Sequence, residues 1–192
     1  MVMKLLICLG NFGGKYELTR HNMGFGAIDS LCDILGGIKL DDTKYNGAYI
    51  KTKYNGEDII VAKPLTYMNL SGDFVAPIAN FYKINPRDII VIHDELALDF
   101  GRIKISYQSS SAGHNGIESI IEKLGTKDFI RVRIGIGPIP PQINQIDFVL
   151  MKYDKSALSE VNEICERSAR AALKIIDDGL EKAMNEVNTK TK

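Results

Sequence analysis

All three histidines of this chain lie in short clusters of polar residues. The clusters are residues 19–22 (TRHN), 93–95 (HDE) and 113–116 (GHNG). They combine imidazoles with carboxylates and amides, and they contain no obvious side-chain nucleophile. Such a set suits activation of water: a neutral imidazole takes the proton, a carboxylate holds the other ring nitrogen, and amides stabilise the developing oxyanion. The residue types therefore favour hydrolysis by general-base catalysis.

Three other kinds of site receive little support from the spacing. A metal centre typically shows a pattern such as H-x-H, H-E-x-x-H or paired cysteines, and the chain has none of these. Serines stand at residues 109–111, but no G-x-S-x-G turn presents a serine nucleophile. The glycines at 10, 13 and 14 do not match the dinucleotide pattern G-x-G-x-x-G. We therefore expect no metal and no organic cofactor.

The composition is that of an ordinary globular protein, with 45% hydrophobic and 25% charged residues among 192. The 24 basic and 24 acidic residues balance, so the basic excess of a general nucleic-acid binder is missing and any such partner needs a local group of cations. No run approaches the ~18 apolar residues of a membrane span, and the apolar start is too short for a secretory signal. Cys8, Cys32 and Cys165 are scattered and odd in number, which argues against a disulfide framework. We expect a cytoplasmic protein without membrane contact.

The spacing of apolar residues predicts the elements that must position the polar clusters. We predict strands at residues 3–9, 48–54, 59–62, 88–92, 102–107 and 130–136, with Asn55-Gly56 as a hairpin turn. We predict helices at 23–35, from Ser71 as N-cap to about 82, at about 114–124, and at 158–176 with Gly179 closing the last one. The apolar face expected for the second helix is Phe74, Val75, Ile78, Phe81 and Tyr82. This order predicts α/β architecture: a single domain over residues 1–192 with a mixed twisted β-sheet flanked by α-helices.

Two of the polar clusters directly follow predicted strands. Gly10 and Asn11 come after the first strand, and His93 and Asp94 come after the strand at 88–92. Because ligands in α/β folds bind beyond the carboxyl ends of strands, we expect these clusters to share one site. His93 and Asp94 should point to opposite faces if the strand pattern persists, so only one of them would enter the site. The periodicity leaves open which one.

Five segments, in order along nearly the whole chain, resemble the motifs of bacterial peptidyl-tRNA hydrolases. They are residues 9–25 (LGNFGGKYELTRHNMGF), 63–72 (KPLTYMNLSG), 113–120 (GHNGIESI), 131–137 (RVRIGIG) and 183–185 (AMN). The resemblance implies that the chain hydrolyses the ester between a peptide and the 3′ end of tRNA. It also implies that the partner is tRNA carrying a peptide.

The resemblance implies a role for individual residues. His21 would be the general base that activates water, and Asp94 rather than His93 would hold it in its basic form. Asn11 would lie beside the scissile ester and help to distinguish peptidyl from unblocked aminoacyl groups. The other implied contacts are Asn69 and Asn115 with the substrate's 3′ end and peptide carbonyls, Tyr16 and Tyr67 with the tRNA end, Met68 in the cleft wall, His114 at the rim, and Lys104 and Arg133 in the region that meets tRNA phosphate.

The chain departs from the family pattern in the regions around these positions. Phe12 replaces the usual proline after Asn11, so the loop loses a residue that fixes φ. Ser106 and Pro138 stand where relatives commonly place cations, and the loop at 108–112 is poorer in glycine. Lys104 and Ser106 share strand parity, so Lys104 would supply part of the missing charge. We therefore expect modest tRNA affinity with a weak dependence on salt.

Two other functions remain as alternatives. A non-catalytic RNA-binding protein could use the same scaffold, because fold does not fix function. A hydrolase for small esters or amides would turn over short substrates without tRNA. The presence of His21, Asp94 and Asn11 together favours the enzyme that acts on peptidyl-tRNA, which we expect to work as a monomer.

Overall fold

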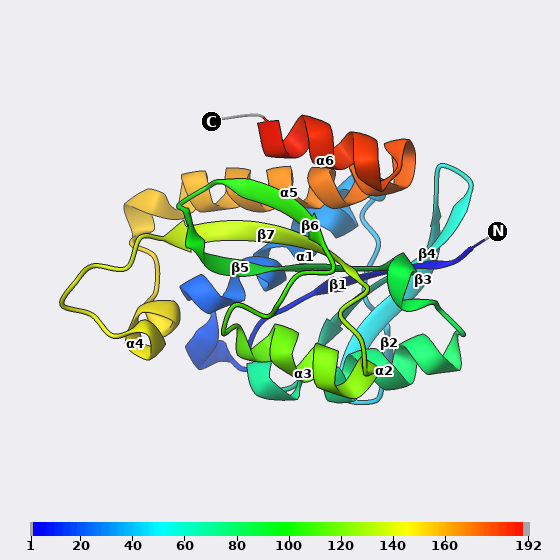
Figure 1. Ribbon diagram of the computed structural model, residues 1–192, viewed down its shortest axis with the longest axis horizontal. Helices are drawn as coiled ribbons and strands as arrows, with labels where there is room; N and C mark the ends of the chain where they lie inside the picture. The colour runs from blue at the N-terminus through cyan, green and yellow to red at the C-terminus, as the bar shows by residue number, and fades with distance from the viewer. Residues whose placement is uncertain (1, 190–192) are drawn as a thin grey trace.

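The computed structural model describes residues 2–189, so Met1 and residues 190–192 of the expected domain lie outside the described residues. One seven-stranded sheet runs through the molecule in the order β2-β3-β4-β1-β5-β7-β6 (Figure 1). Its strands are β1 (Lys4–Cys8), β2 (Asp42–Lys44), β3 (Gly47–Tyr54), β4 (Glu57–Pro64), β5 (Ile89–Asp99), β6 (Ile103–Tyr107) and β7 (Ile130–Gly137). The α-helices are α1 (Met23–Ile34), α2 (Gly72–Phe81), α3 (Asn115–Leu124), α4 (Gln145–Leu150), α5 (Leu158–Asp178) and α6 (Leu180–Thr189). The predicted α/β class with a mixed sheet is confirmed.

Helices cover the sheet on both faces. One core lies between the sheet and α1, α5 and α6, and the other lies between the sheet and α2 and α3. Figure 1 shows α5 and α6 along one side of the strands, with α2 and α3 along the opposite side. The strands of the central sheet bury side chains on both faces, which explains why β1, β4 and β5 read as nearly continuous apolar runs.

The strand pairing accounts for both parallel and antiparallel parts of the sheet. β1 pairs in parallel with β4 and β5, and β5 pairs in parallel with β7. The pairs β2–β3, β3–β4 and β6–β7 are antiparallel. Asn55 and Gly56 both have positive φ, which is the geometry of the tight hairpin turn predicted between β3 and β4.

The strand predicted to end at residue 92 is longer than expected. β5 continues to Asp99 because β7 keeps pairing with it, with His93 opposite Arg133 and Asp94 opposite Ile134. β1 ends earlier, at Cys8, which is opposite Ile92. Asp94 therefore lies within a strand, just beyond the point where the neighbouring strand stops. This placement leaves room for the segment after β1 to cross beside it.

α2 starts where predicted, but its capping contact and one residue of its apolar face differ from the prediction. Ser71 occupies the predicted N-cap position, but its hydroxyl makes no capping hydrogen bond and donates instead to the Met68 carbonyl oxygen at 2.8 Å. Phe81, expected in the core, is 53% exposed at the last residue of the helix, where Nζ of Lys44 lies 3.5 Å from the centroid of its ring. The rest of the predicted face is in the core or packed against it.

Three elements were absent from the prediction: β2, α4 and α6. β2 has only three residues and lies at the edge of the sheet, so it carries little periodic signal. α4 has six residues, and α6 follows α5 directly after Gly179. Within residues 2–189, no helix is long and apolar enough to cross a membrane.

Candidate active site

A cleft of about 480 Å³ opens beyond the carboxyl end of β1. Its lining contains most of the predicted site residues: Asn11, Tyr16, His21, Tyr67, Met68, Asn69, Asp94, His114 and Asn115. These residues come from four separate segments, which the fold brings to one edge of the sheet. Asn11 and Asp94 line the same cleft, as the sequence predicted for the polar clusters that contain them.

His21 reaches the cleft because α1 starts unusually close to the sheet. It lies in a single 3₁₀ turn, residues 20–22, that leads directly into α1. A Cβ atom at Gly24 would lie only 2.4 Å from the Leu9 carbonyl oxygen and 2.5 Å from that of Ile92. Only glycine permits this approach, which sets the first turn of α1 against the ends of β1 and β5. The imidazole of His21 is thereby placed beside Asp94.

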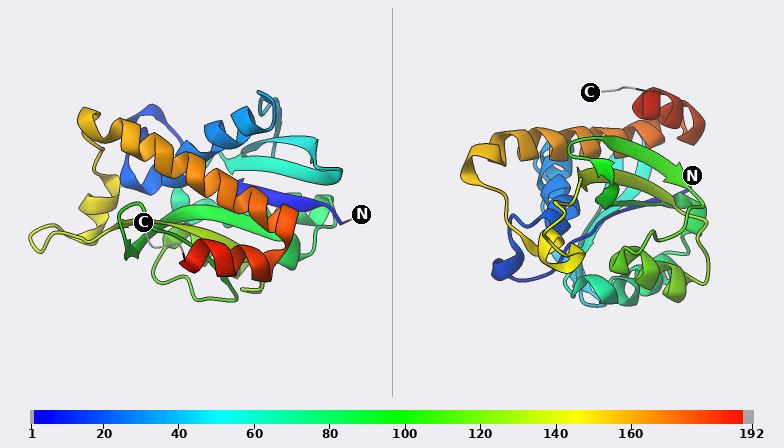
Figure 2. Two further views of the ribbon diagram at one scale, coloured as in Figure 1. Left: turned by 90° about the horizontal axis from the view of Figure 1, so that it is seen from above. Right: turned by 60° about the vertical axis from the view of Figure 1, so that its left-hand side comes forward.

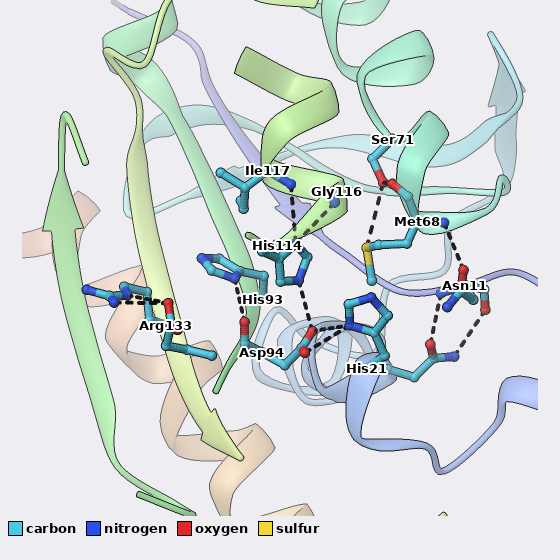
Figure 3. Close-up of polar contacts among 12 residues, drawn as sticks. Asn11, His21, Met68, Ser71, His93, Asp94, His114, Gly116, Ile117 and Arg133 are labelled. Carbon is cyan, nitrogen blue, oxygen red and sulfur yellow. Dashed lines mark hydrogen bonds and ion pairs between the residues drawn. The ribbon is translucent and has the colours of Figure 1, made fainter. Parts of the chain in front are cut away.

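His21 and Asp94 form a buried hydrogen-bonded pair (Figure 3). Nδ1 of His21 lies 2.9 Å from Oδ2 and 3.0 Å from Oδ1 of Asp94, and the two side chains are 9% and 2% exposed. Burial lowers the pKa of His21, but the Asp94 carboxylate raises it by more, so the pKa lies above the ordinary 6.5. Burial would raise the pKa of Asp94, yet His21 and His114 hold it well below its usual range. An ionised carboxylate can only accept, so Nδ1 carries the proton and Nε2 is left as a base.

His93 does not line the cleft, although it is the chain neighbour of Asp94. Its side chain is buried, its Nδ1 lies 2.7 Å from the backbone oxygen of Asp94, and its ring packs edge-on against His114. Burial drives the pKa of His93 well below 6.5, so this imidazole stays neutral. The two neighbours point to opposite sides of β5, and the one that enters the site is Asp94.

Metal binding at this site is disfavoured by the hydrogen bonds. Among residues 2–189, the side chains of His21, Asp94 and His114 present ligand atoms within 4.8 Å of one another. However, Nδ1 of His114 accepts from the backbone amides of Gly116 and Ile117, at 3.1 and 3.3 Å. The proton of a neutral imidazole is then on Nε2, the atom that would have to bind the metal. Two ligands remain, fewer than the three that catalytic zinc sites use.

The side chain of Asn11 is held in one orientation by the loop around it. Its Oδ1 accepts from the Met68 amide at 2.8 Å, while its backbone groups bond to the side chain of Asn22 at 2.8 and 3.1 Å. Nδ2 is therefore the donor that Asn11 offers to a ligand. Phe12 also stabilises this loop, because its backbone N–H donates to Thr66 at 3.0 Å. A proline cannot make that bond, so Phe12 replaces a fixed φ with a hydrogen bond.

The other lining residues differ in how deeply they lie. Tyr16 and Tyr67 form an edge-to-face pair with ring centroids 6.3 Å apart, and Tyr67 is 55% exposed. Asn69 and Asn115 are exposed at the mouth, whereas Met68 is buried in the wall. His114, expected at the rim, lies deeper: its side chain is only 8% exposed. The mouth of the cleft is thus aromatic and amide-rich, and its interior holds the imidazoles.

The structure does not bring Lys104 and Arg133 into the cleft. They face each other across β6 and β7, as do Ser106 and Arg131, and we call these four residues the β6–β7 cation face. The Arg133 guanidinium is paired with Glu95 at 2.9 and 3.0 Å. These cations therefore lie on a separate strand surface, next to the cleft residue Glu95.

Two residues of the β6–β7 cation face are engaged inside the protein. The guanidinium of Arg131 donates to the carbonyl oxygens of Ser109 and Ser110 and is 2% exposed. Burial lowers the pKa of Arg131 to about 10. The hydroxyls of Ser106 and Ser109 lie 3.1 Å apart. These contacts tie down the loop at 108–112 that precedes His114.

Sequence reasoning missed the wall that α4 contributes to the cleft. Gln145, Ile146, Val149 and Leu150 line it, and Ile146 is 72% exposed. Figure 2 shows α4 beside the N-terminal segment, and the backbone N–H of Arg20 donates to Met151 at 3.1 Å. A signal was available: the side chain of Asn144 caps the helix by accepting from the Asp147 amide at 2.9 Å. Asparagine followed three residues later by aspartate, directly before the apolar residues Phe148, Val149 and Leu150, is typical of a helix start.

The comparisons with known proteins agree with this geometry. The family model described as peptidyl-tRNA hydrolase matches residues 5–192. Peptidyl-tRNA hydrolases from Elusimicrobium minutum and an Exiguobacterium species are 43% and 44% identical to the chain, over 97% of it and 100% of each relative. The crystal structure of the peptidyl-tRNA hydrolase from Acinetobacter baumannii is 32% identical, covers 97% of this chain and 95% of its own, and has a TM-score of 0.88. This chain belongs to the peptidyl-tRNA hydrolase family.

Proposed function

We propose that the chain hydrolyses the ester bond between a peptide and the 3′ end of tRNA, with His21 as the general base. Membership of the peptidyl-tRNA hydrolase family supports the substrate and the reaction. The observation that carries the role of His21 is its hydrogen bond to buried Asp94, which leaves Nε2 free inside the cleft. No observation favours the non-catalytic RNA-binding alternative.

The reaction can be written from these groups. Nε2 of His21 takes a proton from water as the water oxygen attacks the ester carbonyl, and Asp94 stabilises the imidazolium that forms. The Nδ2 group of Asn11 donates to an oxygen at the reacting centre, where negative charge develops. The C–O bond to tRNA then breaks, and the imidazolium returns its proton to the leaving 3′ oxygen. The products are a peptide with a free carboxyl group and tRNA with a free 3′ hydroxyl.

The mouth of the cleft suits the rest of the substrate. Tyr16 and Tyr67 offer aromatic faces on which a terminal base can stack. Asn69 and Asn115 offer both donors and acceptors, as an ester flanked by peptide groups and a ribose requires. We assign the tyrosines to the 3′ end of tRNA and the asparagines to the peptide carbonyls and the 3′ end.

We further propose that the protein acts in the cytoplasm as a monomer and without a cofactor. Translation supplies the substrate in that compartment, and the groups needed for the reaction above come from one chain. Light scattering on the purified protein, with and without tRNA, measures the oligomeric state. A stable dimer would contradict the proposal.

Release of the acyl group from N-acetyl-aminoacyl-tRNA tests the activity. We expect turnover of the blocked substrate, much slower release from unblocked aminoacyl-tRNA, and no turnover of short esters that lack tRNA. Binding of the blocked tRNA without release would support the non-catalytic alternative. Turnover of the short esters at a similar rate would instead indicate a hydrolase of small molecules.

A further inference from the structure

Both ring nitrogens of His114 are held by groups of known donor or acceptor type. Nδ1 faces the backbone N–H groups of Gly116 and Ile117 at the start of α3, and Nε2 lies 3.0 Å from Oδ1 of Asp94 (Figure 3). Backbone amides can only donate, so Nδ1 is an acceptor and carries no proton. The single proton of the neutral ring is therefore on Nε2, where it points at Asp94.

Asp94 consequently receives two imidazole donors. His114 donates from Nε2 to Oδ1, and His21 donates from Nδ1 across both oxygens at 2.9 and 3.0 Å. The centroids of the two rings lie 4.9 Å apart, so the two imidazoles that donate to Asp94 are also in contact with each other. Each bond to the ionised group is stronger than a bond between neutral groups, so removing either should be felt by the other.

We propose that His114 is a positioning residue: the first amides of α3 fix its Nε2–H tautomer, so that it permanently donates to Asp94 and weakens the pull of that carboxylate on the His21 proton. This proposal rests on His21 acting as the general base. An Asp94 bonded to His21 alone would hold the imidazolium more strongly, and a protonated His21 cannot accept a proton from water. By sharing the carboxylate, His114 keeps the base neutral closer to the working pH.

The close packing at the start of α3 supports this arrangement. A Cβ atom at Gly116 would lie 2.6 Å from Sδ of Met68 and 3.1 Å from Cε1 of His114. The absence of a side chain there lets the amides approach the ring. On its other side, the ring of His93 packs edge-on with centroids 4.7 Å apart. The orientation of His114 is therefore fixed from three directions.

Other titratable groups face the same region and must be considered in any pH profile. On β5 these are neutral His93 and Glu95, the latter paired with Arg133. On the segment of His21 itself, the Arg20 guanidinium lies over the rings of Phe148 and Tyr153. Burial raises the pKa of Tyr153 far above the neutral range, and Asp147 of α4 is exposed. The variants below leave all of these unchanged.

Two substitutions separate the functions of the two ring nitrogens. In His114→Asn, Oδ1 takes the place of Nδ1 and can still cap α3, but no atom reaches Asp94. In His114→Gln, the longer amide can donate to Asp94, but the acceptor for the α3 amides is lost. The acid limb of kcat/KM for N-acetyl-aminoacyl-tRNA reports the protonation of His21, and thermal unfolding reports the cap.

We expect His114→Asn to unfold near the parent temperature, with its acid limb moved to higher pH by about one unit, because a hydrogen bond to a charged group changes a proton equilibrium by roughly tenfold or more. We expect His114→Gln to unfold at a lower temperature, with its acid limb close to that of the parent. An unmoved acid limb in His114→Asn, or an equal movement in both variants, would overturn the proposal.

A measurement that uses neither substrate nor variants tests the tautomer directly. The ¹⁵N chemical shifts of the imidazole nitrogens in the parent protein distinguish a protonated Nε2 from a protonated Nδ1. We expect His114 to be the Nε2–H tautomer near neutral pH, and a protonated Nδ1 would refute the proposal. Because this experiment does not depend on turnover, failure of the proposed enzymatic function and failure of the tautomer lock are distinguishable.

Discussion

The cleft and the β6–β7 cation face lie side by side, but they use their polar groups in opposite ways. In the cleft, internal hydrogen bonds occupy one end of each reactive side chain and leave the other end free: His21 keeps Nε2 and Asn11 keeps Nδ2. On the cation face, internal contacts occupy both guanidinium groups themselves. The Arg133 guanidinium is paired with Glu95, and that of Arg131 holds two loop carbonyls.

The difference indicates that the chemistry is preorganised more fully than the binding of phosphate. Hydrogen bonds that fix the orientation of a base or donor raise its catalytic efficiency and leave its reactive atom free. A cation that is paired with an internal carboxylate attracts an approaching phosphate more weakly, because the phosphate is also repelled by that carboxylate. We therefore expect substitutions in the cleft to change kcat and substitutions on the cation face to change affinity, and the following predictions test that division in order of decreasing effect.

The largest effect is expected for His21→Ala. Loss of the general base should reduce kcat by ~10²–10⁴-fold while the fold and most of the tRNA affinity are kept. Single-turnover kinetics with N-acetyl-aminoacyl-tRNA, together with binding of a non-hydrolysable mimic, measure the two quantities separately. A folded variant with near-normal kcat would exclude His21 as the base.

Asp94→Asn should reduce kcat by ~10²-fold, the lower end of the range for general-base catalysis, with a smaller effect on KM, because an amide cannot stabilise the imidazolium and favours the wrong tautomer. In the parent, the raised pKa of His21 places the acid limb of kcat/KM above pH 6.5, so activity is lost as the pH falls through that value. Removing the carboxylate charge should move this limb to lower pH. Glu95→Gln, the isosteric change at the next residue, is the control, and a larger loss there would contradict the assignment.

Asn11→Asp should lower the selectivity for blocked substrates. The variant keeps the Oδ1 acceptor that bonds to the Met68 amide, but it loses the Nδ2 donor in the cleft. A neutral hydrogen bond contributes about 0.5–1.5 kcal/mol, so the ratio of kcat/KM between N-acetyl-aminoacyl-tRNA and free aminoacyl-tRNA should fall by up to roughly tenfold. Asn11→Ala, which loses both groups, shows whether the loop bond matters as well. An unchanged ratio in both variants would rule out this role.

Arg133→Ala should weaken binding of a peptidyl-tRNA mimic and reduce the slope of log K against log salt by ~0.7–0.9, the value of one phosphate contact. The variant also frees the carboxylate of Glu95 at the edge of the cleft, which by itself would repel the substrate. The double variant Arg133→Ala/Glu95→Gln separates the two causes. Full recovery of affinity in the double variant would show that Arg133 only neutralises Glu95.

The smallest effect is expected for Ser106→Lys. The new side chain would start on the same strand face as Lys104, beside buried Arg131, and its ammonium should strengthen binding and steepen the salt slope by about one unit if it reaches a phosphate. The substitution also removes a hydroxyl that lies 3.1 Å from that of Ser109, so the gain must exceed any loosening of the loop. Unchanged affinity and slope in a folded variant would mean that this surface does not meet the tRNA backbone.

The sequence by itself determined the elements with strong local signals. The apolar stripe of α5, the Asn55-Gly56 turn and the buried strand β1 follow from periodicity and turn chemistry, which act over a few residues. The spacing of the motif residues identified the family, and with it most of the lining of the cleft, although not the residues of α4. Short elements such as α4 were not predicted, because six residues span less than two helical turns and show little periodicity.

Only the tertiary structure decided how the side chains are partnered. The side of β5 that faces the cleft depends on where β1 ends, and Nε2 of His114 meets the Asp94 carboxylate, which is 20 residues away in sequence. The pairing of Arg133 with Glu95 joins residues 38 apart. These contacts depend on the packing of distant segments, and hydrogen bonds require distances and directions that no local pattern of residues encodes.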